Sequence, residues 1–206
     1  MADHCLLGDV APGSLHEDVD VTGVDDGWDG EGCRFIDCRF TAVTVAGGRA
    51  GRAAWRGGLL DGVRLTGLSM PRSTWLDLRV ERSALSGCEA YGSNWRRVRL
   101  EGCLLDSVNL REATLREVEF VDCTLRHLDI GSARLTDVTM RDCVVERLDL
   151  NGATLGRVDL RGSRLDLARG FDRLRGVTID HNQLLDLAPA FAAHLGLVVR
   201  AAAPPR

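Results

Sequence analysis

Apolar residues recur at every fifth position from Phe35 to Leu165. Two positions before each of them lies a second column that contains only Cys, Val, Ala, Gly, Leu or Ser. The segment from Cys33 to Leu167 holds 21 arginines and 18 acidic residues, and all of them fall in the other three columns. A helix repeats every 3.6 residues and a strand every two, so neither keeps one column of five buried over this length. The pattern predicts a chain that turns once per pentad, with two side chains inward and three outward.

Identical inward residues recur at a spacing of twenty. Trp55, Trp75 and Trp95 form one such set, and three cysteines form another: Cys103, Cys123 and Cys143. If four pentads close one turn, the members of each set stack on neighbouring coils about 4.8 Å apart. Stacked identical side chains are how a repeat protein builds its core. The spacing therefore predicts about seven coils with Trp and Cys ladders inside.

The pentads resemble those of pentapeptide repeat proteins, whose pattern is a small residue, often Asp or Asn, then Leu or Phe and two polar residues. The best matches are Val108-Asn109-Leu110, Ala153-Thr154-Leu155 and Val158-Asp159-Leu160. The resemblance implies an all-β fold, a right-handed quadrilateral parallel β-helix. The pattern is looser from Ala46 to Gly62, which predicts irregular early coils. In layout the chain is most similar to the mycobacterial fluoroquinolone-resistance members of the family.

Composition divides the chain into three parts. Residues 1–32 contain nine acidic residues and no Lys or Arg, and are predicted to be an acidic arm and cap. Within them, residues 19–21 are expected to form a first strand that is out of register. Residues 33–167 are the predicted β-helix. Residues 168–206 lose the five-residue period and are predicted to be a C-terminal cap of strand and helix.

The C-terminal part is predicted to cover the apolar end of the solenoid, because an open coil end exposes core and strand edges. Residues 176–180 read as a last strand and 197–199 as a closing strand. Between them, apolar residues at helical spacing predict a short helical cap, split or kinked at Pro189. Resemblance to the mycobacterial members implies a homodimer through this segment. The candidate interface residues are Leu184, Leu187, Phe191 and Leu195.

The sequence offers no catalytic constellation. The five histidines are scattered, and no Gly-rich phosphate loop, paired carboxylate motif or inserted loop is apparent. Six of the seven cysteines lie in the small inward column and are expected to be reduced core thiols rather than metal ligands or disulfides. We therefore expect a non-enzymatic protein without cofactor or metal.

The resemblance implies a binding function, in which the rod mimics duplex DNA, binds DNA gyrase or topoisomerase IV and protects it from inhibitors. This mechanism requires carboxylates where the enzyme expects phosphates. The net charge of −4 arises from residues 1–32, whereas the coils are slightly basic. Acidic residues predominate from residue 117 onward, beside the predicted dimer end. The candidate DNA-mimicking residues are Glu119, Asp122, Asp129, Asp137, Asp142, Glu146, Asp149 and Asp159.

Two other functions stay open. A general protein-interaction scaffold is favoured by the mixed surface charge: Asp61, Glu81 and Glu101 form a row at spacing twenty, but arginines nearby predict cross-coil ion pairs. Direct nucleic-acid binding is the weaker alternative, because the arginines assigned to one face lack lysine or aromatic support; they are Arg56, Arg96, Arg97 and Arg116. No apolar run is long enough to span a membrane, and the N-terminus lacks the features of a secretory signal. We expect a cytoplasmic protein.

Overall fold

From Asp37 to Gly162, the corner residue of each pentad, two positions after the apolar centre, has left-handed backbone geometry. Its φ is 53° at Asp37, 52° at Arg97 and 56° at Asp137. Glycine occupies the same place at Gly62 and Gly102. A single left-handed residue between extended segments bends the chain once and lets it continue straight. The period of five in the sequence is therefore the period of the corners.

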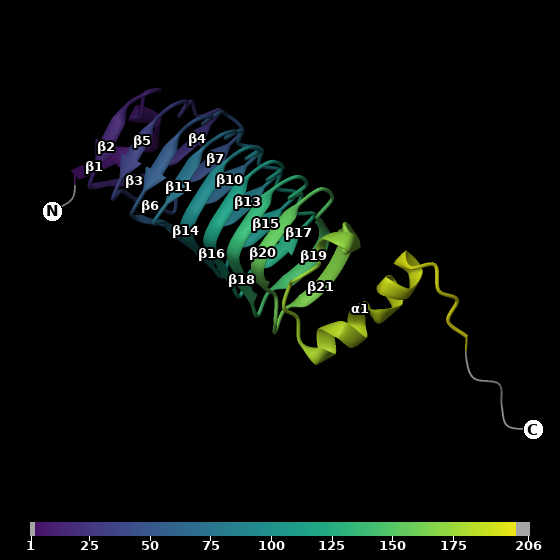
Figure 1. Cartoon of the computed structure of the whole chain (residues 1–206). Helices are drawn as coiled ribbons and strands as arrows, with labels where there is room; N and C mark the ends of the chain where they lie inside the picture. The colour runs from purple at the N-terminus through teal and green to yellow at the C-terminus, as the bar shows by residue number, and fades with distance from the viewer. Residues whose placement is uncertain (1–2, 201–206) are drawn as a thin grey trace, which may run out of the picture.

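The computed structural model describes residues 3–200 and is a parallel β-solenoid of about eight turns with one C-terminal helix (Figure 1). Neighbouring coils pair in register at twenty residues, as at Trp75 and Trp95. We number the four faces by an inward residue that each carries. Face I contains Trp55, face II Leu60, face III Leu65 and face IV Met70.

A 13-stranded sheet covers faces I and II, and an 8-stranded sheet covers face III. Face IV is held by single parallel bridges that run from Asp29↔Arg49 to Asp129↔Asp149. The strands of face I are β2 (Leu15–Glu17), β5 (Arg34–Ile36), β8 (Ala54–Arg56) and β11 (Thr74–Leu76). Those of face II are β1 (Asp3–Leu6), β3 (Val19–Thr22), β6 (Arg39–Thr41), β9 (Leu59–Asp61) and β12 (Arg79–Glu81).

Later strands run continuously across the corner between faces I and II. They are β14 (Asn94–Glu101), β16 (Thr114–Val121), β18 (Arg134–Arg141) and β20 (Thr154–Asp159). Face III consists of β4 (Val24–Asp26), β7 (Thr44–Ala46), β10 (Arg64–Thr66), β13 (Ala84–Ser86), β15 (Leu104–Asp106), β17 (Thr124–Arg126), β19 (Val144–Asp149) and β21 (Arg164–Arg169). Two short 3₁₀ helices, η1 (Leu7–Asp9) and η2 (Phe171–Arg173), and one α-helix, α1 (His181–His194), complete the fold.

The predicted tryptophan ladder is present in the core of face I. Trp55, Trp75 and Trp95 are paired in register and buried. The rings of Trp75 and Trp95 are stacked with centroids 4.5 Å apart, whereas those of Trp55 and Trp75 meet edge to face at 5.8 Å. The stack continues through Phe35, 5.6 Å from Trp55. Aromatic pairs of this kind add to the stability that burial provides.

The six inward cysteines are buried and unbridged, as the sequence predicts. Cys103, Cys123 and Cys143 form one column, because the strands that follow them are paired in register. Burial raises the pKa of the Cys88 thiol to about 11. Since the thiolate is the reactive form, a buried thiol of this kind serves as a small core residue.

The acidic N-terminal segment winds into an additional turn, which explains why there are about eight turns instead of the seven expected. The predicted strand at residues 19–21 lies within β3 and pairs with β6 at an offset of nineteen, Asp20 opposite Arg39. From Val24, which pairs with Thr44, the offset is twenty. The apolar period nevertheless begins only at Phe35, because Asp25 and Gly30 occupy the positions of the apolar column in this stretch.

The irregularity predicted between Ala46 and Gly62 is present. Gly47-Gly48 and Gly57-Gly58 are consecutive left-handed pairs, where other pentads have one such residue. A Cβ on Gly58 would lie 2.0 Å from the carbonyl oxygen of Cys38. The backbone approaches the neighbouring coil so closely there that glycine is required.

The helix α1 closes the C-terminal end of the solenoid. The Asp180 side chain caps it, accepting a hydrogen bond from the backbone N–H of Gln183. The Gln183 side-chain amide donates to the carbonyl oxygens of Leu160 and Ser163, each at 2.5 Å. These carbonyls belong to the last turn, where no further coil would satisfy them. Leu187 is buried against the same end.

Two details of the C-terminal prediction are wrong, and of the two alternatives predicted at Pro189 the split helix is also wrong. Residues 176–180 contribute one bridge, Asp159↔Thr178, rather than a strand. Residues 197–199 are not a strand and are at least 61% exposed. Pro189 does not divide the helix in two, because a proline removes one backbone donor and the remaining turns continue. Of α1, Gln183 and Leu187 are buried against the coil end.

Replacing Gly58 by alanine should destabilise the protein far more than replacing Gly62. Both glycines have positive φ, so each variant incurs the cost of alanine in left-handed backbone, about 1 kcal/mol. Gly58→Ala must also displace the Cys38 carbonyl, which accepts from the N–H of Leu59, and should cost about 3 kcal/mol in total. Denaturant unfolding measures the free energy of unfolding of both variants. Equal losses of stability would contradict the close approach of the Gly58 backbone to the Cys38 carbonyl.

Candidate interaction surfaces

The interior of the solenoid is filled by side chains. An enclosed space of about 20 Å³ lies in the early coils between Trp28, Phe40, Trp55 and Trp75. Small-molecule sites usually occupy about 300 to 1,000 Å³. This space cannot hold a substrate, so any function of the coils must lie on their outer surface.

The four outer faces carry different charges at their strand positions. Face I, from β5 to β20, has five arginines and no carboxylate: Arg34, Arg56, Arg96, Arg116 and Arg134. Over the same coils, face II balances five arginines (Arg39, Arg79, Arg99, Arg141, Arg161) with five acids (Asp61, Glu81, Glu101, Glu119, Asp159). Face III there balances Arg64, Arg126 and Arg164 with Asp106, Glu146 and Asp166. Face IV there carries Glu89, Asp129 and Asp149 against Arg49 and Arg111. The first turn adds acids to all four faces: Glu17, Asp20, Asp26, and Asp29 with Glu31.

Ion pairs between neighbouring coils neutralise much of this charge. Arg99 lies 2.6 Å from Glu119 and 2.9 Å from Glu101, and Arg82 lies 2.6 Å from Asp61. The predicted pairing of the row Asp61, Glu81 and Glu101 is therefore present, with Arg82 in the place expected for Arg79. These pairs are exposed, so they set the surface pattern more than the stability.

Two ion pairs lie along the corner between faces I and II and join neighbouring coils. Hydrogen bonds from Arg97 lower the pKa of the Asp77 carboxyl, and Arg157 lowers the pKa of Asp137 in the same way. Each pair joins corner residues exactly one turn of twenty residues apart in sequence. The coil register therefore decides which charges meet.

The eight candidate DNA-mimicking residues do not share one face. Glu119 and Asp159 lie on face II, Glu146 on face III, Asp129 and Asp149 on face IV, and Asp122, Asp137 and Asp142 at corners. Six of them have an arginine within 4.0 Å. Asp122 and Asp142 are exposed and have no ion pair within residues 3–200. Their role as phosphate mimics stays a prediction.

An acidic row on face IV was missed in part by the sequence analysis. The bridges place Glu89, Asn109, Asp129 and Asp149 on consecutive coils. The Asn109 amide donates to Glu89 at 2.6 Å, and Asp129 and Asp149 each accept a backbone N–H two residues ahead. Glu89 and Asn109 could have been found from the spacing of twenty that identified the ladders.

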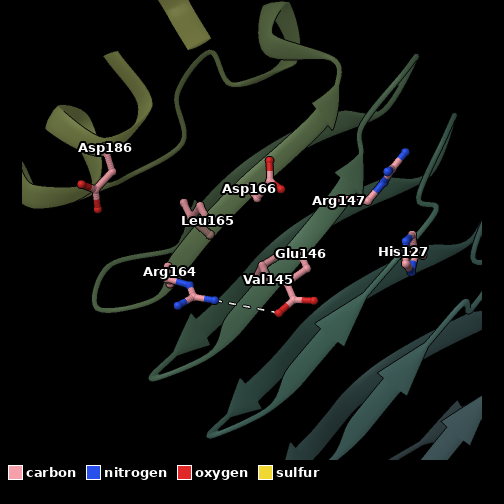
Figure 2. A pocket seen from close by; sticks show the side chains of 8 residues that line it. All are labelled: His127, Val145, Glu146, Arg147, Arg164, Leu165, Asp166 and Asp186. Atoms are coloured by element: carbon pink, nitrogen blue, oxygen red, sulfur yellow. Dashed lines mark ion pairs between the residues drawn. The ribbon is translucent and has the colours of Figure 1, made fainter. Parts of the chain in front are cut away.

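An open groove of about 740 Å³ runs between face III and α1. Figure 2 shows Asp186 entering it from the helix, while Glu146, Arg164 and Asp166 enter from the strands. Arg164 lies 3.9 Å from Glu146. The groove mixes both signs of charge, and its residues show no arrangement of nucleophile, base and orienting partner.

The four candidate interface residues on α1 separate into two groups. Leu187 is buried and Phe191 packs against Phe171 with ring centroids 5.9 Å apart, so both face the coil end. Leu184 and Leu195 are exposed, by 47% and 70%. The outward side of the helix also carries an apolar groove of about 590 Å³, lined by Leu185, Ala188, Pro189, Ala192, Leu197 and Val199. Leu185 and Ala192 were not among the sequence candidates.

No helix among the described residues is long and apolar enough to cross a membrane. Within the same residues, no group of three or more His, Cys, Asp or Glu side chains is placed to hold a metal ion.

Comparison with known proteins identifies the repeat. Residues 93–169 match the family described as "Pentapeptide repeat region". No curated protein is significantly similar in sequence.

Among solved structures, the chain is similar to a trypsin-treated variant of QnrB1, a plasmid-mediated fluoroquinolone resistance protein. That match has 16% identity over 98% of this chain and 100% of the other, with a TM-score of 0.43. HetL, a pentapeptide repeat protein involved in heterocyst differentiation regulation in the cyanobacterium Nostoc, gives 14% identity over 82% and 90%, with a TM-score of 0.35.

Rfr23, from the cyanobacterium Cyanothece, gives 23% identity over 43% of this chain and 61% of the other, with a TM-score of 0.34. The family match covers the coils in which strands β14, β16, β18 and β20 run across the corner between faces I and II. Residues 93–169 of this chain are therefore a pentapeptide repeat region.

Proposed function

We propose that the chain is a non-enzymatic binding protein that presents charged faces of a rigid solenoid to a protein partner. The observation that carries this proposal is the unequal distribution of charge over the coils, with only arginines at the charged strand positions of face I, an acidic row on face IV, and balanced charge on faces II and III. A filled interior leaves the outer surface as the place of function. Parallel strands in register hold the surface side chains at fixed spacing, which favours recognition of a partner over catalysis.

A type II topoisomerase, DNA gyrase or topoisomerase IV, is the first partner to test. The acidic row on face IV supports this choice, because a DNA mimic needs carboxylates in line along the rod. The row places its members about 4.8 Å apart per coil, whereas each DNA strand carries a phosphate every 3.4 Å along the axis. The row is thus sparser than a phosphate track. Protection of such an enzyme from its inhibitors would follow from competition with DNA.

A general protein-interaction scaffold is the second candidate. It is favoured by the arginines that neutralise six of the eight candidate carboxylates. A partner would then recognise the pattern of both charges instead of a negative track.

The topoisomerase proposal is tested by supercoiling and drug-stabilised cleavage with purified gyrase, with and without a quinolone. The protein should inhibit supercoiling and reduce cleavage, and Asp129→Asn with Asp149→Asn should weaken both effects several-fold by removing two charges. Asparagine preserves the corner hydrogen bond, as Asn109 does with the N–H of Arg111.

The matched control is Asp37→Asn with Glu112→Gln, which removes the same charge at two exposed corners outside the eight candidate residues and should change little. If the wild-type protein affects neither supercoiling nor cleavage, the topoisomerase proposal fails. Equal weakening by both double variants would contradict the role of face IV.

We also propose that the protein is a homodimer through α1. The outward side of α1 exposes Leu184, Leu185 and Leu195, beside the exposed residues 197–199. A contiguous apolar surface of this kind on a small protein marks an interaction site. A second copy related by a two-fold axis would cover the same patch on both chains.

Leu185→Glu should convert the dimer to a monomer, because Leu185 lines the outward groove and does not cover the coil end. Leu6→Glu is the matched control, since Leu6 is similarly exposed at the opposite end of the rod. Light scattering measures the mass of the wild-type protein and of both variants. A monomeric wild-type protein, or a dimeric Leu185→Glu variant, would contradict the assignment.

A further inference from the structure

Face I is the one face whose outward strand positions, from β5 to β20, carry charge of a single sign. Each inward residue there, from Phe35 to Leu155, is flanked by two outward positions, and these hold five arginines and no carboxylate. The equivalent positions of face II, on the same strands from β14 onward, hold as many acids as arginines. Since the two faces share one architecture, the fold does not require the difference.

The arginines of face I are placed where they repel one another. Arg96 and Arg116 are directly opposed on adjacent strands, and like charges in that position are destabilising. On face II, Arg79 and Arg99 are opposed in the same way, but Arg99 there forms an ion pair with Glu119 on the next coil. On face I, Arg116 contacts the corner residue Glu117 at 3.1 Å.

The other four arginines of face I have no ion pair in the described part of the chain: Arg34, Arg56, Arg96 and Arg134. Their side chains are exposed. Of the corner carboxylates beside face I, Asp77 and Asp137 are engaged by Arg97 and Arg157, while Asp37 has no ion pair among residues 3–200. The guanidinium groups of these four arginines are therefore free to bind an anionic group from outside.

The register fixes the spacing of these groups. Arg56, Arg96 and Arg116 follow their inward residues and share one column. Adjacent coils lie about 4.8 Å apart, so Arg56 is about 10 Å from Arg96 along the column. Arg34 and Arg134 lie in the second column, about 7 Å away across the strand. Thr74, Asn94 and Thr114 lie between them and add neutral hydrogen-bond donors.

We propose that face I is a docking surface for an acidic, carboxylate-rich peptide segment of a partner protein. The planar guanidinium group matches a carboxylate with two parallel hydrogen bonds. An extended peptide places alternate side chains about 7 Å apart on one side, a distance similar to the spacing between the two arginine columns.

Two further features favour a peptide over a nucleic acid. Single-stranded nucleic acids are bound by aromatic side chains on which bases stack, and no outward position of face I from β5 to β20 is aromatic. Ile36 and Leu76 are half-buried on this face and offer apolar contact to the side chains of a peptide. The inference rests on the proposed binding function and names the partner chemistry of one face, separate from the acidic row on face IV.

The test is fluorescence anisotropy with a labelled oligoglutamate peptide as the probe, using the full-length protein. Wild-type protein should bind the probe, and a matched oligoglutamine peptide should not bind. Added salt should weaken binding, because the contacts are exposed ion pairs. Arg56→Gln with Arg96→Gln should reduce the affinity several-fold to about tenfold, as expected for two exposed ion pairs.

The matched control is Arg39→Gln with Arg79→Gln on face II. These arginines are also exposed and have no ion pair among residues 3–200. Replacing them gives a protein with the same net charge as the face I double variant. The control should leave the affinity for oligoglutamate within about twofold of wild type. Circular dichroism on both double variants verifies that each is folded.

Three results would overturn the inference. They are no binding of oligoglutamate by the wild-type protein, equal loss in the two double variants, and tighter binding of labelled duplex or single-stranded DNA than of the peptide. Failure of the gyrase assay with retained peptide binding would reject the topoisomerase proposal alone. Because the face I substitutions leave Asp129 and Asp149 unchanged, the two failures are distinguishable.

Discussion

The left-handed corner residue at every fifth position is the constraint on which the rest of the structure depends. It holds φ between 46° and 58° at most non-glycine corners, in residues as different as Arg82, Ser107 and Glu112. Left-handed backbone costs about 1 to 2 kcal/mol for an ordinary residue. The cost recurs throughout the solenoid, and the backbone hydrogen bonds and buried ladders between coils must offset it. No corner would be stable in an isolated pentad.

Four corners close a turn of twenty residues, and this closure decides which side chains become neighbours. It stacks Trp75 on Trp95 inside and brings Arg157 to Asp137 outside. The same register opposes Arg96 and Arg116 on face I, where no cross-coil acid compensates them. A structure that repeats so regularly turns small differences between columns into differences between whole faces. The outward columns therefore carry the side chains that a partner can contact, and the inward columns form the core.

The sequence predicts the coils and their core well because burial and corner geometry restrict the residue type at each position of a pentad. The spacing of Trp55, Trp75 and Trp95 was sufficient to predict their ladder. The first turn could not be predicted, since Asp20 pairs with Arg39 at nineteen residues and the period is lost there. Residues 197–199 are apolar enough for a strand, but Gln183 already satisfies carbonyl groups of the last turn. The candidate carboxylates were chosen because acidic residues predominate from residue 117 onward. The face that each of them occupies depends on the coil register, which separates them over faces II, III and IV.

The most direct test of the corner constraint compares two alanines four residues apart. Ala42 is an exposed corner with φ 51°, and Ala46 is exposed in β7. Ala42→Gly should relieve left-handed strain and stabilise the protein by up to about 1 kcal/mol, whereas Ala46→Gly should destabilise it by about 0.5 to 1 kcal/mol. Unfolding in denaturant measures the free energy of unfolding of both variants and of the wild-type protein. If Ala42→Gly destabilises the protein as much as Ala46→Gly does, the account of the corners is contradicted.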